Sequence, residues 1–401
     1  MKTLKRLYDS FLAEHLAALR QMAFVSGPRQ VGKTTTCGKQ AGVRLNWDNP
    51  DDRRIILAGP AALAERAGIG RLRGREPILL LDELHKYPRW KSLLKGFFDT
   101  YEEQVKVIVT GSSRLDVYRR GGDSMMGRYF IYRMHPFSVA ETGRQDLPDC
   151  ERILRDPAKP SEREFQALWR HGGYPEPFAR RDARFSQRWK GHRYQQLLRE
   201  DIRDTGGIQH LDQLEMLVAL LASRSAHQLI YSSLATEIRV SVDTIRRWVT
   251  TLCSFHYGFL VKPWFRNVSR ALRKEPKWFL RDWSAIEDPG ARAETFIACH
   301  LLKAVEGWTD LGLGRFDLHY LRDKQKREVD FLVVRDGDPW FLVEGKKNEP
   351  KVSKELGYFQ KQTKAPHAFH VVLDDKYVDA DCFSRNDPVS VPARTLLSQL
   401  L

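Results

Sequence analysis

Short apolar runs alternate with amphipathic stretches over roughly the first 145 residues. The clearest runs are AFVS at 23–26, ILLLD at 78–82, VKVIVTGSS at 105–113 and RYFIYRM at 128–134. Ahead of them, apolar residues recur at helical spacing between Leu4 and Leu19, which predicts an amphipathic first helix. A chain that repeats strand and helix favours a parallel sheet with helices on both faces. We therefore expect an α/β domain over residues 1–148.

The pattern changes twice beyond this region. From about 150 to 285 the chain becomes helical and basic, interrupted by the glycine and proline turn HGGYPEP. From about 286 a helical stretch, ARAETFIACHLLKAV, precedes the strand-like runs FDLHYL, EVDFLVV and WFLVEGKK, a further helix and HAFHVVL. We therefore predict a helical middle region at 149–285 and a C-terminal α/β domain at 286–401.

Composition and charge narrow the class of protein. With 401 residues, 42% of them hydrophobic, the chain is globular, which excludes disordered and fibrous proteins. The apolar runs fall far short of the ~20 residues that a membrane-spanning helix needs. The 66 basic and 51 acidic residues leave a net charge of +15, and basic residues are concentrated at 180–203. This excess favours a polyanion as partner, although charge also serves solubility. Together with the motifs described below, it leads us to expect a nucleic acid, DNA more than RNA.

The five cysteines lie far apart without any CxxC pair. This spacing argues against a disulfide framework and against a zinc site, and it favours a reducing, cytoplasmic location.

A phosphate-binding pattern, GPRQVGKT at 27–34, follows the first apolar run and precedes a predicted helix. Gly27 and Gly32 let the backbone curl so that its N–H groups surround phosphates. Lys33 reaches the β and γ oxygens, and Thr34 supplies a hydroxyl to Mg²⁺. Thr35 is a further nucleotide-binding candidate. The pattern predicts an ATP site.

An acidic strand end completes such a site. In ILLLDELHK, Asp82 is expected to bind Mg²⁺ through water, and Glu83 to polarise the attacking water. Glu83 as a solvated loop acid remains an alternative. Two strands later, VTGSS offers Thr110 and Ser112 as sensors of the γ-phosphate, with a plain turn as the alternative.

The order of these motifs resembles that of an AAA-type ATPase. In that family an arginine before the fifth strand reaches into the neighbour's site, and Arg128 in MMGRYFIYR occupies the matching place. Its rivals are Arg114, Arg119 and Arg120. The resemblance implies a homo-oligomer with ATP sites between subunits. PFSVAE, GGYPEP, LLREDI and LRKEPKWFLRD also resemble a prokaryotic family of such ATPases whose C-terminal domain has no known function.

The middle region contains SSLATEIRVSVDTIRRWVTTL at 232–252, which has the spacing of a helix-turn-helix, as in a winged helix. Ser241 is expected to cap the second helix, while Ile245 and Trp248 pack against the first. Thr244, Arg246 and Arg247 then face outward and are candidates for DNA contact. A lid or linker role, common in AAA-type proteins, is the alternative.

Three charged residues converge in the predicted C-terminal domain. Glu344 and Lys346 are two apart in a strand and share a face, and a hairpin around RDGDP returns the chain beside Asp330. The arrangement resembles the PD-(D/E)xK nuclease pattern of restriction-endonuclease-like folds, in which acids hold Mg²⁺ and lysine positions water. Glu294 is a possible extra ligand, and Gln360 a possible lining residue. A salt-bridged face without activity is the alternative.

Together these features predict an ATPase that binds DNA and cuts it with Mg²⁺ or Mn²⁺, acting on DNA structures or on repair or defence substrates. The competing hypothesis is a non-cutting, ATP-driven switch. Such a protein would bind DNA or a protein partner through a degenerate nuclease-like domain.

Overall fold

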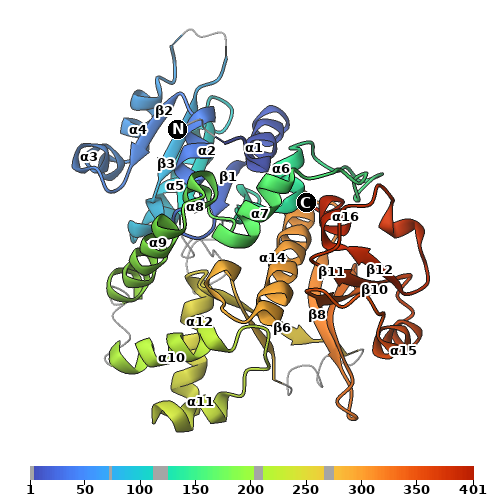
Figure 1. Cartoon of the computed structure of the whole chain (residues 1–401). Coiled ribbons are helices and arrows are strands. Elements are labelled where there is room, and N and C mark those ends of the chain that lie inside the picture. The colour runs from blue at the N-terminus through green and yellow to red at the C-terminus, as the bar shows by residue number, and fades with distance from the viewer. Residues whose placement is uncertain (1–3, 72–74, 112–124, 203–210, 266–274) are drawn as a thin grey trace. The chain divides into compact units, whose positions relative to one another are not determined.

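The computed structural model describes residues 4–71, 75–111, 125–202, 211–265 and 275–401 (Figure 1). The chain divides into two compact units. The first unit comprises residues 1–135 and 145–147, and the second comprises 136–144 and 148–401. No helix among the described residues is long and apolar enough to cross a membrane.

The first unit is a five-stranded parallel sheet with strand order β2-β3-β4-β1-β5. Its strands are β1 (Met22–Ser26), β2 (Val43–Asn46), β3 (Ile78–Asp82), β4 (Lys106–Gly111) and β5 (Tyr129–Arg133). Its helices are α1 (Leu7–Ala18), α2 (Lys33–Gln40), α3 (Pro50–Ala58), α4 (Pro60–Ala67) and α5 (Trp90–Tyr101), with a 3-10 turn η1 at Leu84–Lys86. β4 follows β3 directly along the chain, so VTGSS ends the next strand after the acidic one, whereas the sequence led us to expect the second.

Alternation along the strands divides the core of the first unit between two faces of the sheet. Phe24, Leu79 and Leu81 belong to one hydrophobic cluster with Leu63 of α4 and Leu94 of α5. The intervening strand residues are also buried and lie on the opposite face: Ala23, Val25, Leu80 and Ile108. The expected α/β architecture is therefore present, with apolar residues on both sides of the sheet.

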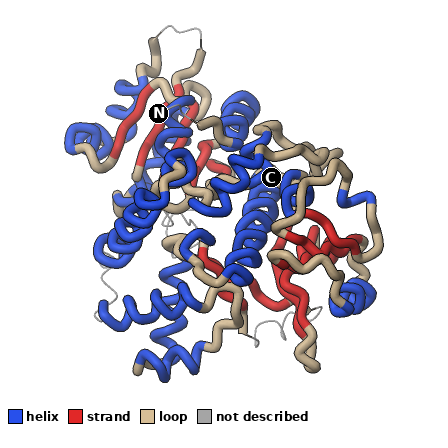
Figure 2. Tube along the Cα trace, in the orientation of Figure 1, coloured by secondary structure: helices blue, strands red, loops and turns tan. Residues whose placement is uncertain are grey.

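The second unit begins with helices (Figure 2). They are α6 (Val139–Gly143), α7 (Glu162–His171), α8 (Pro175–Arg180), α9 (Ala183–Gln196), a π-helical turn η3 (Leu197–Ile202), α10 (Leu211–Ser223), α11 (Tyr231–Ile238) and α12 (Val242–Ser254). An antiparallel hairpin of β6 (Gly258–Pro263) and β7 (Lys277–Leu280) follows.

The remainder of the second unit is α/β. It contains η5 (Trp283–Ala285), α14 (Pro289–Asp310), β8 (Phe316–Arg322), β9 (Glu328–Arg335), β10 (Asp338–Lys346), α15 (Lys354–Thr363), β11 (His367–Val372), η6 (Cys382–Ser384), β12 (Val389–Pro392) and α16 (Ala393–Ser398). The strand order is β12-β11-β10-β9-β8-β6-β7. Because β6 pairs with β8, one sheet crosses the expected boundary at 285. The three-domain division stays a prediction.

Candidate functional site

The phosphate-binding loop connects β1 to α2, and its two glycines adopt conformations that few other residues tolerate. Gly27 has φ +150°, and a Cβ there would lie 2.4 Å from the carbonyl oxygen of Met134. Gly32, at φ 101°, is the N-cap of α2. The loop therefore leads directly into the N-terminus of α2, where backbone N–H groups favour an anion.

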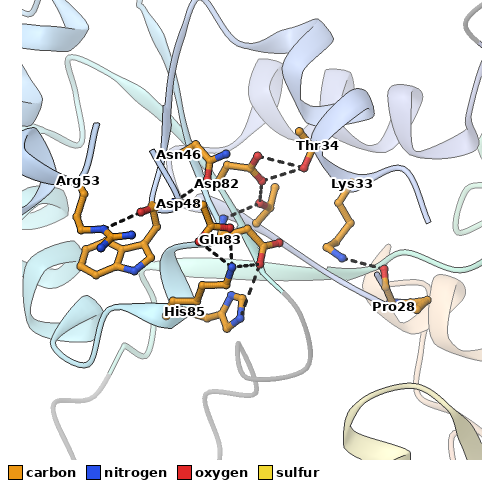
Figure 3. Close-up of polar contacts among 12 residues, drawn as sticks. Pro28, Lys33, Thr34, Asn46, Asp48, Arg53, Asp82, Glu83 and His85 are labelled. Carbon is orange, nitrogen blue, oxygen red and sulfur yellow. Dashed lines mark hydrogen bonds and ion pairs between the residues drawn. The ribbon is translucent and has the colours of Figure 1, made fainter. Parts of the chain in front are cut away.

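Lys33 is buried at the start of α2, with 5% of its surface exposed. Its Nζ donates to the carbonyl oxygen of Pro28 at 2.8 Å (Figure 3). It also donates to the carbonyl oxygen of Gly27, at 2.8 Å. Burial lowers the pKa of Lys33 to about 8, although the nearby carboxylates of Glu83 and Asp82 oppose the shift. The ammonium thus lies within its own loop, where it can meet a phosphate after little movement.

Asp82 ends β3 beside this loop and is almost fully buried. The Thr34 hydroxyl donates to its two carboxylate oxygens, at 3.0 and 3.1 Å (Figure 3). The Thr110 hydroxyl, at the end of β4, also donates to Asp82. A hydroxyl and a carboxylate placed together are the oxygen ligands that suit Mg²⁺, so Thr34 and Asp82 fit the expected metal pair.

Glu83 has a left-handed backbone, with φ 56° and ψ 25°, which turns the chain out of β3. Its N–H donates to the Thr110 hydroxyl at 3.3 Å. Its carboxylate lies 3.7 Å from Lys86 Nζ and 3.9 Å from His85 Nε2, and is 20% exposed. Thr110 therefore positions both acids, while Glu83 keeps access to solvent, as a residue that activates water requires.

The other nucleotide-site candidates lie less centrally or outside the described residues. Thr35 is exposed on α2. Ser112 falls outside the described residues, as do Arg114, Arg119 and Arg120. Arg128 lies in the turn before β5, and its Nε and Nη2 donate to the two carboxylate oxygens of Asp99 on α5, at 2.6 and 2.9 Å. The roles of Thr35, Ser112 and Arg128 stay predictions.

Two arginines at the nucleotide site had no sequence motif to mark them. Arg6 is 3% exposed, and its guanidinium donates to the carbonyl oxygens of Val31 and His135 at 2.6 and 2.7 Å, which supports the loop from behind. Arg44 on β2 places Nη2 2.6 Å from Asp82 Oδ2. In the sequence, Arg44 is marked only by its place in the short run VRLN. This run forms β2, a strand that our sequence analysis does not predict.

In the second unit, the hairpin between β9 and β10 brings the predicted C-terminal residues together. Lys346 Nζ lies 3.2 Å from Glu344 Oε1, and the N–H of Gly345 donates to Asp330 Oδ2 at 3.0 Å. Burial alone would lower the pKa of Lys346, but Asp330 and Glu344 outweigh it and the pKa is raised. Asp330, Glu344 and Lys346 are therefore neighbours, as their spacing predicts.

A residue that our sequence reasoning missed, Lys277 on β7, lies in the same cluster. Its Nζ is 2.9 Å from Glu294, 2.6 Å from Glu328 and 3.2 Å from Asp330, and only 3% of the residue is exposed. Within the part of the chain that the structure describes, no three acidic, histidine or cysteine side chains form a set of metal ligands. An ammonium thus lies where we expected Glu294 and Asp330 to bind a metal ion, and their metal role stays a prediction.

Glu344 and Gln360 have partners of their own. Glu344 accepts a hydrogen bond from the Ser353 hydroxyl, and its Oε2 lies 3.6 Å from His370 Nδ1. Gln360 donates through Nε2 to the backbone carbonyl oxygens of Ala365 and Asn386, at 3.2 and 2.6 Å. Gln360 therefore connects the backbone at Ala365 and Asn386, and a role in lining the carboxylate cluster stays a prediction.

The predicted helix-turn-helix is formed by α11 and α12. The Ser241 hydroxyl accepts from the N–H of Thr244 at 3.1 Å, so Ser241 caps α12 as expected. Ile245 and Trp248 are buried, whereas Arg246 and Arg247 are exposed. The β6–β7 hairpin follows α12 along the chain.

Family comparisons agree with the geometry of the first unit. Residues 19–143 match the model of a family described as an AAA domain. The first unit is therefore similar to an AAA-type P-loop ATPase domain. The second unit matches two families described as domains of unknown function, DUF8612 at residues 162–286 and DUF4143 at residues 289–389.

The relatives and solved structures that match most of this chain have low sequence identity to it. The uncharacterized proteins Mb2031c of Mycobacterium bovis and Rv2008c of Mycobacterium tuberculosis are each 22% identical over 346 residues, which is 84% of this chain and 72% of theirs. The Aeropyrum pernix ORC1 protein in complex with DNA is 14% identical with a TM-score of 0.30, over 73% of this chain and 91% of that one. A single-residue variant of Thermotoga maritima RuvB is 15% identical with a TM-score of 0.28, over 63% of this chain and 86% of that one. These scores are too low to extend the assignment.

Proposed function

We propose that this protein hydrolyses ATP in its AAA domain and acts as a nucleotide-driven switch that binds DNA without cutting it. The observation that carries the proposal is the placement of Lys33, Thr34, Asp82 and Glu83 around one strand edge. Structural proteins have little use for a buried lysine and a buried aspartate in one glycine-rich loop region, because burying charged groups is costly.

The residues around this strand edge divide the tasks of ATP hydrolysis among them. The loop N–H groups and Lys33 bind the β and γ phosphates, and Thr34 with Asp82 holds the Mg²⁺ ion. When bound, the metal withdraws charge from the phosphates. Glu83 orients the attacking water and accepts its proton, while Thr110 keeps both acids in place.

The second unit supports DNA binding through exposed arginines. Arg184 and Arg188 lie one helical turn apart on α9, and Arg246 and Arg247 lie on the outer face of α12. Of the other basic residues at 180–203, Lys190 donates to the Ser284 carbonyl oxygen and is used internally. The exposed guanidiniums suit phosphate contacts, which add affinity regardless of sequence.

Lys277 favours the non-cutting form of the switch. Its ammonium lies within 3.2 Å of Glu294, Glu328 and Asp330 and compensates charge that a catalytic metal would otherwise compensate. A metal-dependent nuclease is the second candidate, because Lys346 and Glu344 lie in contact beside Asp330 as that chemistry requires.

An oligomer with ATP sites between subunits belongs to the same proposal. Arg128 lies at the turn before β5, and its partner Asp99 is half-exposed. Since an ion pair that is open to solvent contributes little stability, Arg128 can exchange Asp99 for a phosphate in a neighbouring subunit at small cost.

The test measures ATP turnover and DNA cleavage in the same preparation. We expect turnover that is lost in Lys33→Ala, that changes when linear, branched or single-stranded DNA is added, and that is accompanied by no cleavage with Mg²⁺ or Mn²⁺. Lys39→Ala, on an exposed part of α2, is the matched control for Lys33. Cleavage that disappears in Lys346→Ala would establish the nuclease instead, and turnover unchanged in Lys33→Ala would refute the ATPase site.

A further inference from the structure

Asp82 has one charged partner and two neutral ones among the contacts that the structure describes. The hydroxyls of Thr34 and Thr110 donate to it without carrying charge. Arg44 Nη2, at 2.6 Å from Oδ2, is the charged partner. Lys33 is turned toward the carbonyl oxygens of Gly27 and Pro28. The negative charge of the buried Asp82 carboxylate is therefore compensated directly by Arg44, which belongs to none of the site's motifs.

The position of Arg44 follows from the sheet. β2 pairs in parallel with β3, with Arg44 opposite Leu80 and Asn46 opposite Asp82. The long side chain of Arg44 thus runs along the strand toward the carboxyl edge, where Asp82 lies. The two ends of this ion pair differ in burial, because the Arg44 side chain is 45% exposed and that of Asp82 only 2%. Arg44 can leave into water, whereas Asp82 cannot.

We propose that Arg44 is an internal counter-ion which Mg²⁺ must displace from Asp82, so that Arg44 sets the Mg²⁺ concentration needed for nucleotide binding. The inference rests on the proposed ATPase function. A guanidinium and a hydrated divalent cation compete for the same carboxylate oxygens, so each bound state excludes part of the other. Because the Arg44 side chain is half exposed, its ion pair with Asp82 breaks at small cost. This suits a site that must bind and release Mg²⁺ in each cycle.

The test is a titration of the full-length protein with a fluorescent ATP analogue at rising Mg²⁺ concentrations and in EDTA. Arg44→Gln keeps a hydrogen-bond donor and removes the charge. We expect the Mg²⁺ concentration at half-saturation to fall about two- to tenfold, since a charge-assisted bond is strong but this one is open to solvent. Affinity in EDTA, measured for both proteins, gives the effect of the lost charge on the nucleotide itself and is subtracted from the effect of Mg²⁺. Arg54→Gln, a surface arginine of α3 paired with Asp51, is the control for the loss of one charge.

A half-saturation that is unchanged or higher in Arg44→Gln would overturn the inference, because Arg44 would then be neutral toward the metal or would assist it. Combining Arg44→Gln with Asp82→Asn tests whether Arg44 acts through Asp82. Once the carboxylate is gone, Arg44→Gln must no longer change the Mg²⁺ concentration at half-saturation. Thermal unfolding in EDTA identifies a variant that has lost its fold, and Arg44→Lys then serves as the milder change with a smaller shift. If the wild-type protein binds no analogue at any Mg²⁺ concentration, the proposed function itself fails and takes this inference with it.

Discussion

Replacing Lys277 by methionine removes a buried ammonium from a cluster of three carboxylates. Its Nζ lies 2.9, 2.6 and 3.2 Å from Glu294, Glu328 and Asp330, whose side chains are 17, 22 and 13% exposed. Removing one partner of a buried pair costs about 3–5 kcal/mol, because the other charge stays buried and unpaired. Since water reaches the three carboxylates in part, we expect the lower end, about 3 kcal/mol of unfolding free energy at neutral pH.

The loss of unfolding free energy in Lys277→Met depends on pH, and the pKa of Glu294 determines the direction of that dependence. Burial, reinforced by Asp330, raises the pKa of Glu294, even though Lys277 opposes the shift. A carboxyl group whose pKa is higher in the folded state stabilises the fold at low pH, and this stabilisation disappears as the pH rises through the folded pKa. Without the ammonium the pKa of Glu294 rises further. The folded-state pKa of Glu294 is already about 8 with the ammonium present, so the deficit of Lys277→Met is expected to stay level up to about pH 7 and to grow as the pH rises above 8.

Urea unfolding followed by circular dichroism, with hydrogen exchange of the β7 amides, measures this deficit at pH 7, 8 and 9.5. Lys262→Met on the neighbouring strand β6 is the control, because Lys262 is exposed. A deficit of less than about 1 kcal/mol at pH 7, or a deficit at pH 9.5 no larger than that at pH 7, would show that Lys277 does not compensate these carboxylates.

Three further predictions concern ATP and DNA. Glu83→Gln should bind ATP normally but turn it over about 10²–10⁴-fold more slowly, and wild-type turnover would exclude Glu83 as the base. Because burial lowers the pKa of Lys33 to about 8, its ammonium is charged at pH 7 and largely neutral at pH 9. The Kd for ATP should therefore rise about tenfold over that interval, and a flat profile from a fluorescent-analogue titration would contradict it. Joint replacement of Arg246 and Arg247 by glutamine should weaken DNA binding and lower its salt dependence by up to about two phosphate contacts, whereas Thr250→Ala on the same exposed face should not.

Local sequence patterns were sufficient to predict those features that are formed by residues close together in the chain. GPRQVGKT lies between β1 and α2, ILLLDE ends β3, and Ser241 caps α12. These features have short-range causes, namely glycine conformation, strand alternation and capping hydrogen bonds. The hairpin that brings Asp330 beside Glu344 and Gly345 is also local, although its two-residue turn sets only the first pairs and a bulge between Pro339 and Phe341 shifts the register by one residue.

The short strand β2 and the β6–β7 hairpin were harder to predict. VRLN has one fully buried residue, so its pattern of burial does not stand out from a loop. β6 continues the sheet of β8, which begins more than fifty residues later. Pairing between strands so far apart depends on the whole fold, and no periodicity within one segment reports it.

The sequence by itself determined the phosphate loop, the acidic strand end, the helix-turn-helix and the convergence of Asp330 with Glu344 and Lys346. Only the tertiary structure decided which cations compensate the two sets of acids. Arg44 comes to Asp82 from β2, and Lys277 comes to Asp330 from β7. Charge compensation acts through space over a few ångströms, so residues far apart in the chain can supply it and a linear motif cannot record them.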